Sequence, residues 1–297
     1  MVDIDIDLVR TLVHEQFPRW RDLPVEPVHR QGWDNRTFRL GSELSVRLPS
    51  AEGYVAGVAK EDRWLPVLAP WLPLPVPTVV ATGRPGSGYP YPWSVRRWLP
   101  GDIIAGVVDR LRLAQDRGRF LARLRQLPTE HAPVGGLHSF FRGCHPSVYG
   151  DQVQRSLAAL GADVDVAACR RIWADATVSA WPSAPAWFHG DVAEGNLLAV
   201  HGALSSVIDF GTCGVGDPAC DLVIAWTYFS GEERVVFRDA VGLDDDTWAR
   251  ARGWALWKAL VTLANPADPD PAQHEIVRQI LRDPVTPRRS GAAAWSS

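Results

Sequence analysis

Residues 187–198 read WFHGDVAEGNLL, and residues 205–211 read SSVIDFG. In the first stretch Asp191 and Asn196 lie five positions apart across a glycine-containing loop, and in the second Asp209 ends a short apolar run. Apolar residues border both groups, which is the pattern of a short buried β insert. The two stretches therefore predict that two carboxylates and one carboxamide meet at a loop and a strand end.

Phosphoryl transfer from a nucleotide requires this set of side chains. One carboxylate orients the attacking hydroxyl and accepts its proton, while a carboxamide and a second carboxylate hold a divalent cation on the phosphates. Alone, each residue fits a turn or a strand-end cap, so the joint spacing carries the prediction of a kinase-type site. An alternative is a metal-dependent hydrolase with His189, Asp191 and Asp209 as ligands, although it needs further ligands and only His201 is near in sequence.

Three motifs give the chain a resemblance to a known family. HGDVAEGN (189–196), IDFG (208–211) and GDPACDL (216–222) stand in the order and spacing of the aminoglycoside phosphotransferase family. That family has the fold of eukaryotic-like protein kinases. The resemblance therefore implies a nucleotide-dependent kinase with ATP or GTP as donor, Mg²⁺ as cofactor and a small-molecule hydroxyl as acceptor.

The same resemblance implies a role for each matching residue. Asp191 would be the catalytic base, and His189 would support the catalytic loop. Asn196 and Asp209 would be the magnesium ligands. In the third motif Asp217 and the aspartate at 221 would form a structural brace, although both also fit a cap and first turn ahead of a helix over 218–229.

The rest of the chain predicts an α+β protein with a bilobal, protein-kinase-like fold. Strand-like and helical patterns mix over residues 1–98, the expected N-terminal nucleotide-binding lobe, whereas 99–287 is mainly helical, as a catalytic and substrate-binding lobe would be. Residues 288–297 are expected to form a flexible tail. The periodicities place strands at 43–49, 77–82 and 93–98, helices at 5–17, 54–68, 109–127, 149–160, 166–179, 246–264 and 271–282, and the β insert at 186–210.

A kinase also needs a cation on the nucleotide phosphates, held by a carboxylate of a neighbouring helix. Arg47 lies on the polar face of strand 43–49, and Glu61 lies on the apolar stripe of the following helix. Because a charge on an apolar stripe needs a partner, Arg47 is the predicted partner of Glu61. The family usually has lysine at this strand position, and Lys60 points elsewhere. Arg47 therefore favours an alternative of another class, a catalytically silent nucleotide-binding protein.

Two backbone segments complete the predicted nucleotide site. Residues 30–40 are expected to place Gly32 and Asn35 in a tight turn between two strands, with backbone N–H groups toward phosphate. By the family resemblance, backbone groups of Arg97 and Leu99 in the linker would hydrogen-bond the base.

Composition excludes several classes of protein. The 297 residues carry 31 basic and 34 acidic side chains, a net charge of −3, so no nucleic-acid partner is expected. Without an apolar window long enough for a membrane span or a leader, we expect no membrane contact and a cytoplasmic location. The four cysteines form no CxxC pair and are expected to be free thiols.

Charge and aromatic content point to different acceptors. Residues 189–246 contain 11 acidic side chains against two basic ones, which would attract a cationic aminoglycoside unless these carboxylates are solvated helix ends. Aromatic residues of the predicted C-terminal helices would favour an apolar or planar acceptor if they line the cleft, although most are expected in the core. They are Trp226, Tyr228, Phe229, Trp248, Trp254 and Trp257.

Together these features predict an ATP- or GTP-dependent, magnesium-requiring O-phosphotransferase, monomeric or homodimeric. Its acceptor would be an antibiotic such as an aminoglycoside. The alternatives are a macrolide, a nucleoside antibiotic or a small metabolite.

Overall fold

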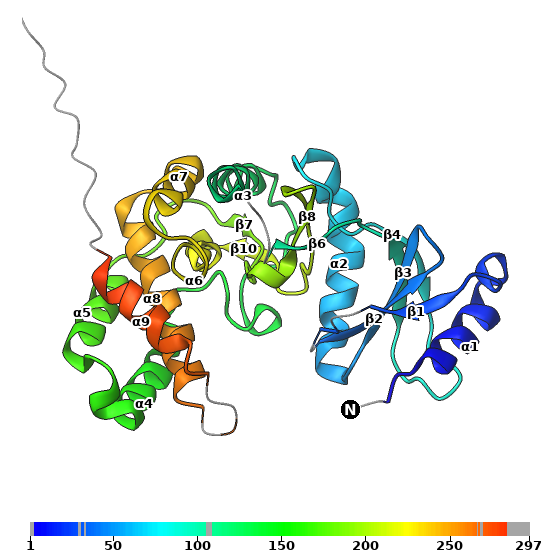
Figure 1. Cartoon of the computed structure of the whole chain (residues 1–297), viewed down its shortest axis with the longest axis horizontal. Coiled ribbons are helices and arrows are strands. Elements are labelled where there is room, and N and C mark those ends of the chain that lie inside the picture. Colours follow the sequence, from blue (N-terminus) through cyan, green and yellow to red (C-terminus); the bar gives the residue numbers. More distant parts are fainter. Residues whose placement is uncertain are drawn as a thin grey trace, which may run out of the picture.

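The computed structural model describes residues 3–28, 31–32, 34–104, 109–265, 267 and 270–283. These residues form a small body built around a β-sheet and a larger, mainly helical body beside it (Figure 1). The predicted α+β class is confirmed. The expected tail over 288–297 lies outside the described residues.

The small body contains a five-stranded antiparallel sheet in the order β1-β2-β3-β5-β4. In β3 the side chains alternate as the sequence predicts, with Leu44, Val46 and Leu48 in an apolar core and Arg47 on the opposite face. The strands are β1 (Val25–Pro27), β2 (Asn35–Leu40), β3 (Leu44–Pro49), β4 (Val79–Gly83) and β5 (Trp93–Arg97).

Two helices accompany this sheet. Helix α1 (Ile6–Gln16) buries Val9, Leu12 and Val13 against the apolar strand residues, and Asp5 caps it by accepting from the Leu8 N–H at 2.8 Å. Helix α2 (Val55–Leu68) contacts β4 and β5 and lies between the two bodies in Figure 1. Side chains on the polar face of β3 and β5 therefore point toward α2.

The apolar cores do not divide where the sequence predicts the lobes to divide. Leu65 and Leu68 of α2, together with Val76, belong to the core of the larger body. The C-terminal part of helix α2 thus packs on the larger body through Leu65 and Leu68, while the helix also contacts the sheet of the smaller body. The division at residues 98 and 99 stays a prediction.

Helix α8 (Asp245–Leu263) is the centre of the larger body, with buried residues on nearly every side. It packs against α4 (Gly150–Leu160), α5 (Val166–Ala176) and α9 (Gln273–Arg282), while α3 (Arg110–Arg125) packs against α7 (Gly231–Val241). Two small sheets carry the loops of interest: β7 (Ala186–Phe188) with β10 (Gly214–Gly216), and β6 (Asp102–Ile103), β8 (Leu197–Val200) and β9 (Ala203–Val207) in the order β6-β8-β9.

The expected helix over 218–229 is wrong. The chain instead forms a 3-10 segment, Pro218–Leu222, and then the single turn α6 (Ile224–Thr227). The next helix, α7, begins at a capping box in which Ser230 and Glu233 satisfy each other's backbone N–H groups. The sequence contains this S-x-x-E signature, which marks the start of α7 at a point where the pattern of apolar residues alone continues without interruption.

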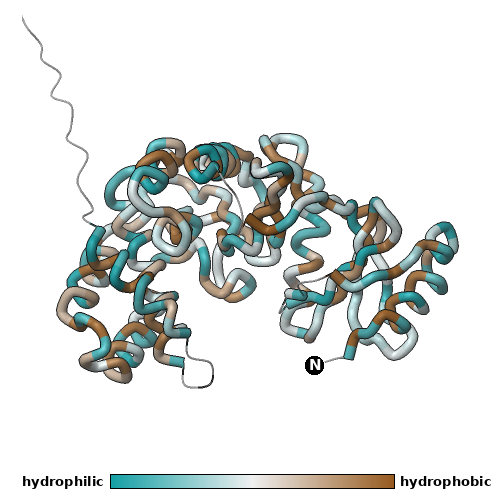
Figure 2. The backbone as a smooth tube through the Cα atoms, viewed as in Figure 1, coloured by the Kyte–Doolittle hydropathy of each residue, from teal (hydrophilic) through white to brown (hydrophobic). Residues whose placement is uncertain are grey.

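Apolar and hydrophilic residues are interspersed along the helices in Figure 2. Among the described residues, no helix combines the length and the hydropathy that a membrane crossing requires.

Candidate active site

The loop between β7 and β8 brings Asp191 and Asn196 into contact. The Asn196 side-chain Nδ2 donates both to the Asp191 carboxylate Oδ2 and to the Asp191 backbone carbonyl, each at 2.9 Å. Because both bonds use the amide nitrogen, the Asn196 Oδ1 is left as an acceptor for a further partner. The loop thus orients a carboxylate and an amide oxygen together.

His189 ties this loop to the strand-end turn that holds Asp209. Its Nε2 donates to the Ile208 carbonyl at 3.0 Å, and its Nδ1 accepts from the Asp191 N–H at 3.2 Å. Since a carbonyl can only accept and an amide N–H can only donate, the imidazole is neutral with its proton on Nε2. Burial, followed by the charge of Arg117, lowers the pKa of His189 below its ordinary value of 6.5.

This buried imidazole makes stability depend on pH. As the pH falls below 6.5, His189 becomes protonated in the unfolded chain while it stays neutral in the folded chain. Protonation thus favours the unfolded state, so the free energy of unfolding should fall as the pH falls. The slope from one such proton is at most about 1.4 kcal/mol per pH unit. We expect urea unfolding of His189→Gln to depend less on pH between 6.5 and 5 than that of the wild type. A matched change at the exposed His131 should leave the slope intact, and equal slopes in all three proteins would contradict this assignment.

Asp221 holds the loop between β7 and β8, while Asp217 holds the segment that follows β10. Asp221 is buried and accepts from the backbone N–H groups of His189 at 2.8 Å and Gly190 at 2.7 Å. Asp217 accepts from the Ala219 N–H at 3.0 Å, as a cap does, and pairs with the buried Arg250 at 2.7 Å. Asp221 therefore satisfies two backbone N–H groups, and Asp217 supplies a carboxylate for the buried Arg250.

Gly190 and Asp209 both adopt left-handed backbone conformations. Gly190 has a φ of +87°, and a Cβ there would lie 2.7 Å from the Thr212 Oγ1, so only glycine fits this turn. Asp209 has a φ of +66°, which is uncommon for a residue with a side chain. The strained turn aims the carboxylate across the boundary between the two bodies toward β3.

Arg47 meets Asp209 there. Its Nη2 donates to the Asp209 Oδ1 at 2.5 Å, and its Nη1 lies 3.3 Å from the Glu61 Oε1. Burial alone would raise the pKa of Asp209, but the charge and the hydrogen bond of Arg47 hold it below its ordinary range. Arg47 therefore joins the strand, α2 and the strand-end turn.

Glu61 has more partners than the sequence indicates. It is fully buried, its Oε1 accepts from the Phe210 N–H at 2.8 Å, and its Oε2 accepts from the Arg96 Nη1 at 2.9 Å. Arg96 also donates to Asp62 at 2.8 Å. Arg96 was not among the residues predicted for the site, although the alternation in β5 places Ser94 and Arg96 on the same face as Arg47 and would have indicated it.

The turn expected over residues 30–40 has a different form. Asn35 is the first residue of β2 and not a turn residue. With its amide oxygen toward the guanidinium, Asn35 accepts from the Arg47 Nη2 at 3.0 Å and Nε at 3.2 Å. Gly32 lies in the preceding loop, where its carbonyl accepts from Arg36. The strand begins earlier than expected because Asn35 already pairs with Pro49.

The linker groups and Lys60 are also placed. The Arg97 N–H donates to the Thr78 carbonyl at 2.9 Å, so this N–H is already used within the sheet, and Leu99 follows two residues beyond the end of β5. Lys60 points away from Glu61, since its Nζ lies 2.9 Å from the His138 Nδ1. Burial lowers the pKa of Lys60.

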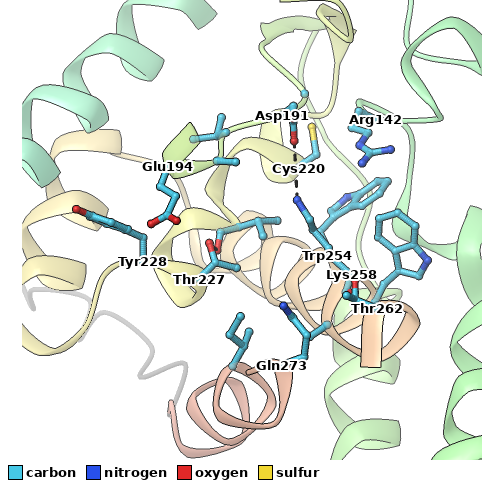
Figure 3. A pocket seen from close by; sticks show the side chains of 17 residues that line it. Arg142, Asp191, Glu194, Cys220, Thr227, Tyr228, Trp254, Lys258, Thr262 and Gln273 are labelled. Atoms are coloured by element: carbon cyan, nitrogen blue, oxygen red, sulfur yellow. Dashed lines mark hydrogen bonds and ion pairs between the residues drawn. The ribbon is translucent and has the colours of Figure 1, made fainter. Parts of the chain in front are cut away.

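A pocket of about 890 Å³, its open mouth included, lies beside Asp191 (Figure 3). Lys258 of α8 reaches up to Asp191, with 3.8 Å between its Nζ and the Asp191 Oδ1. This pair was not predicted, because nothing in the local sequence pattern of α8 shows which side of the helix faces the loop between β7 and β8. Other lining side chains are Arg142, Glu194, Cys220, Thr227, Tyr228, Trp254, Trp257, Thr262, Gln273 and Ile276.

The pocket corrects two expectations about the acceptor. Of the acidic side chains over 189–246, only Asp191 and Glu194 line it. The carboxylates near α7 and α8 serve the helices instead: Glu233 pairs with Arg110 at 2.6 Å, and Asp244 caps α8. Conversely, Trp254 and Trp257 were expected in the core; they are largely buried, yet they also form a wall of the pocket.

The hydrolase alternative is wrong for this geometry. Both ring nitrogens of His189 are engaged with backbone groups. Across the described ranges, no three His, Cys, Asp or Glu side chains are grouped closely enough to bind a metal together.

Comparisons with known proteins agree with this fold. The sequence profile of the phosphotransferase enzyme family, abbreviated APH, matches residues 26–254. An aminoglycoside 2'-phosphotransferase-IIIa solved with GDP is 19% identical over 92% of this chain and 96% of that one, with a TM-score of 0.67. The ADP-bound aminoglycoside phosphotransferase APH(2'')-Ib is 15% identical over 94% and 97%, with a TM-score of 0.61.

The macrolide 2'-phosphotransferase MphH from Brachybacterium faecium is 21% identical over 94% of this chain and 99% of that one, with a TM-score of 0.59. No curated protein sequence matches. Identities this low establish the fold, which is that of the kinase-like antibiotic phosphotransferases, while the profile match covers most of the chain. This chain belongs to the phosphotransferase enzyme family.

Proposed function

We propose that this protein transfers the terminal phosphoryl group of ATP or GTP to a hydroxyl of a small molecule. One observation carries the proposal: Asp191 and Asn196 are hydrogen-bonded beside an open pocket, and the Ile208 N–H donates to the Asn196 carbonyl at 2.9 Å, which brings the turn that holds Asp209 to the same loop. Asp191 orients the acceptor hydroxyl and receives its proton. His189 acts as a positioning residue, because it holds Asp191 and the Asp209 turn through backbone groups.

The donor set fits magnesium. Asn196 offers a free amide oxygen, and Asp209 uses only Oδ1 for Arg47 while its side chain remains 32% exposed. Mg²⁺ prefers such hard oxygen ligands and keeps several waters. A bound magnesium ion would neutralise charge on the nucleotide phosphates, and Asn196 and Asp209 would hold it.

Arg47 is the proposed phosphate cation. It sits on β3 between Asn35 and Asp209, and Glu61 fixes it from α2. Asn35, Asp209 and Glu61 use four of its five N–H groups, so Arg47 offers phosphate its positive charge and one remaining Nη1 N–H, where the family usually has lysine. Backbone groups of the Gly32 loop, and of Arg97 and Leu99, are proposed to contact phosphate and base. The complete set of Asp191, Asn196 and Asp209 favours an active enzyme over a silent nucleotide-binding protein.

The proposal is tested by incubating the protein with Mg²⁺ and either ATP or GTP, against a panel of aminoglycosides, macrolides, nucleoside antibiotics and hydroxylated metabolites. Mass spectrometry should detect the gain of one phosphoryl group on at least one acceptor, and slow nucleotide hydrolysis without acceptor. If neither acceptor gain nor hydrolysis exceeds that of Asp191→Asn, the proposed function is wrong. Cytoplasmic location and a monomeric or dimeric state stay predictions.

A further inference from the structure

The charges that line the pocket are divided between its ends. Arg142 and Lys258 lie near Asp191, with the Trp254 ring between them, while Glu194 lies beside Tyr228 at the far end (Figure 3). The pocket therefore presents two cations close to the proposed base. These two cations offset the charges of Asp191 and Glu194, so the lining carries no net negative charge for an acceptor with many ammonium groups.

Arg142 contacts an aromatic ring and a backbone carbonyl. Its guanidinium lies 5.5 Å from the centroid of the Trp257 ring, and its Nη1 donates to the Phe140 carbonyl at 3.3 Å. Within the described part of the chain, no carboxylate lies within ion-pair distance of Arg142. A half-buried guanidinium with unused donors is suited to bind a carboxylate in two-point contact.

The carboxylates of the pocket are few, and one is already paired. Asp191 accepts from Asn196 at 2.9 Å and lies 3.8 Å from Lys258, so its charge is largely compensated. Glu194 is the remaining acidic group of the lining. With Asp191 and Lys258 paired, the lining leaves one carboxylate, Glu194, and one cation, Arg142, so an acceptor with several ammonium groups would find too few anionic partners.

Aromatic side chains occupy the wall next to Arg142. Tyr149 stacks on Trp257 with 4.0 Å between ring centroids, and Trp254 meets Trp257 edge to face at 5.5 Å. This arrangement holds both indoles rigidly, so the wall is preformed. Trp254 is 2% and Trp257 9% exposed, so an acceptor would meet only the parts of these fixed rings that border the pocket, where packing costs little conformational entropy.

On the basis of the proposed function, we propose that the acceptor is an anionic hydroxyl compound. It carries a carboxylate that Arg142 binds, a flat apolar part that packs on the tryptophan wall, and a hydroxyl at Asp191. In the transfer step the acceptor oxygen forms a bond to the terminal phosphorus, and the bond from that phosphorus to the bridging oxygen breaks. The nucleoside diphosphate leaves with the electron pair, and the hydroxyl proton goes to Asp191. Lys258, whose Nζ lies 3.8 Å from the Asp191 Oδ1, compensates the negative charge of that carboxylate before the proton arrives.

A matched pair of probes tests this inference. 4-Methylumbelliferyl β-D-glucuronide and 4-methylumbelliferyl β-D-glucoside share a flat ring and sugar hydroxyls, and they differ in one carboxylate. By calorimetry we expect the wild type to bind the glucuronide about tenfold more tightly than the glucoside, as one charge-assisted contact predicts. Arg142→Gln should bring the two affinities within about twofold. The matched surface change Arg21→Gln should keep the preference.

Equal affinities in the wild type, undetectable binding of both glycosides, or kanamycin binding more tightly than the glucuronide would overturn the inference. Nucleotide hydrolysis by the same wild-type preparation tests the phosphotransferase activity separately from the preference for an anionic acceptor. Hydrolysis that Asp191→Asn abolishes, without a preference for the glucuronide, refutes the anionic acceptor and leaves the phosphotransferase standing. Absence of hydrolysis and of acceptor phosphorylation refutes the phosphotransferase itself.

Discussion

Asp191→Asn is expected to lower the rate of phosphoryl transfer by about 10³-fold, since positioned general bases contribute about 10²–10⁴. The amide keeps the shape of the carboxylate and can still accept from Asn196, so the loop should remain folded. The variant loses the group that orients the hydroxyl and takes its proton. Nucleotide affinity should change by no more than about twofold, because Asp191 belongs to the acceptor side of the site.

The measurement is kcat with the best acceptor of the panel, together with nucleotide hydrolysis. Asp22→Asn is the control, because the Asp22 side chain is 92% exposed and distant in sequence from the site. A variant at Asp191 that keeps more than a tenth of wild-type turnover would remove Asp191 from the role of base.

Glu61→Ala should have the largest effect on stability, with a loss of about 3–5 kcal/mol in the free energy of unfolding. Glu61 is fully buried, and its removal leaves Arg96, Arg47 and the Phe210 N–H without their common acceptor. Arg47 then keeps only Asp209 as a carboxylate partner and Arg96 only Asp62, and the two buried cations lose the carboxylate that they share.

Urea unfolding measures this loss, with Asp62→Ala as the matched control. Asp62 lies next to Glu61 and accepts one bond from Arg96, but it is partly exposed, so we expect a loss of only about 1 kcal/mol. Glu61→Gln keeps an acceptor for the Phe210 N–H and should fall between the two. Equal losses in Glu61→Ala and Asp62→Ala would show that the cluster does not join the two bodies.

Much of the fold was predictable from periodicity. The alternation over 43–49 fixed which face of β3 is apolar, and the stripes over 54–68 and 246–264 correspond to α2 and α8. The failure at 218–229 has a physical cause. Pro218 and Asp217 signal a helix start, but the carboxylate at 221 serves the catalytic loop, and the chain leaves the helix after one turn of α6.

The site was predictable only where its residues share one motif. Asp191 and Asn196 are near in sequence, so a loop had to bring them together. Contacts between elements that are far apart in sequence could not be predicted from local patterns. The pair of Lys258 with Asp191, for example, depends on how α8 packs beneath the loop between β7 and β8. Arg96 was predictable in part. The alternation in β5 shows that its side chain lies on the same face of the sheet as Arg47, but it does not show that Arg96 is a second cationic partner of Glu61.

Calorimetric binding of a non-hydrolysable ATP or GTP analogue, with and without Mg²⁺, tests the central claim most directly. If Asn196 and Asp209 hold the metal on the nucleotide phosphates, Mg²⁺ should tighten binding to the wild type by at least about tenfold, the equivalent of 1.4 kcal/mol. That gain should disappear in Asp209→Asn, while the affinity without Mg²⁺ should not fall. An undiminished Mg²⁺ effect in Asp209→Asn would contradict the account.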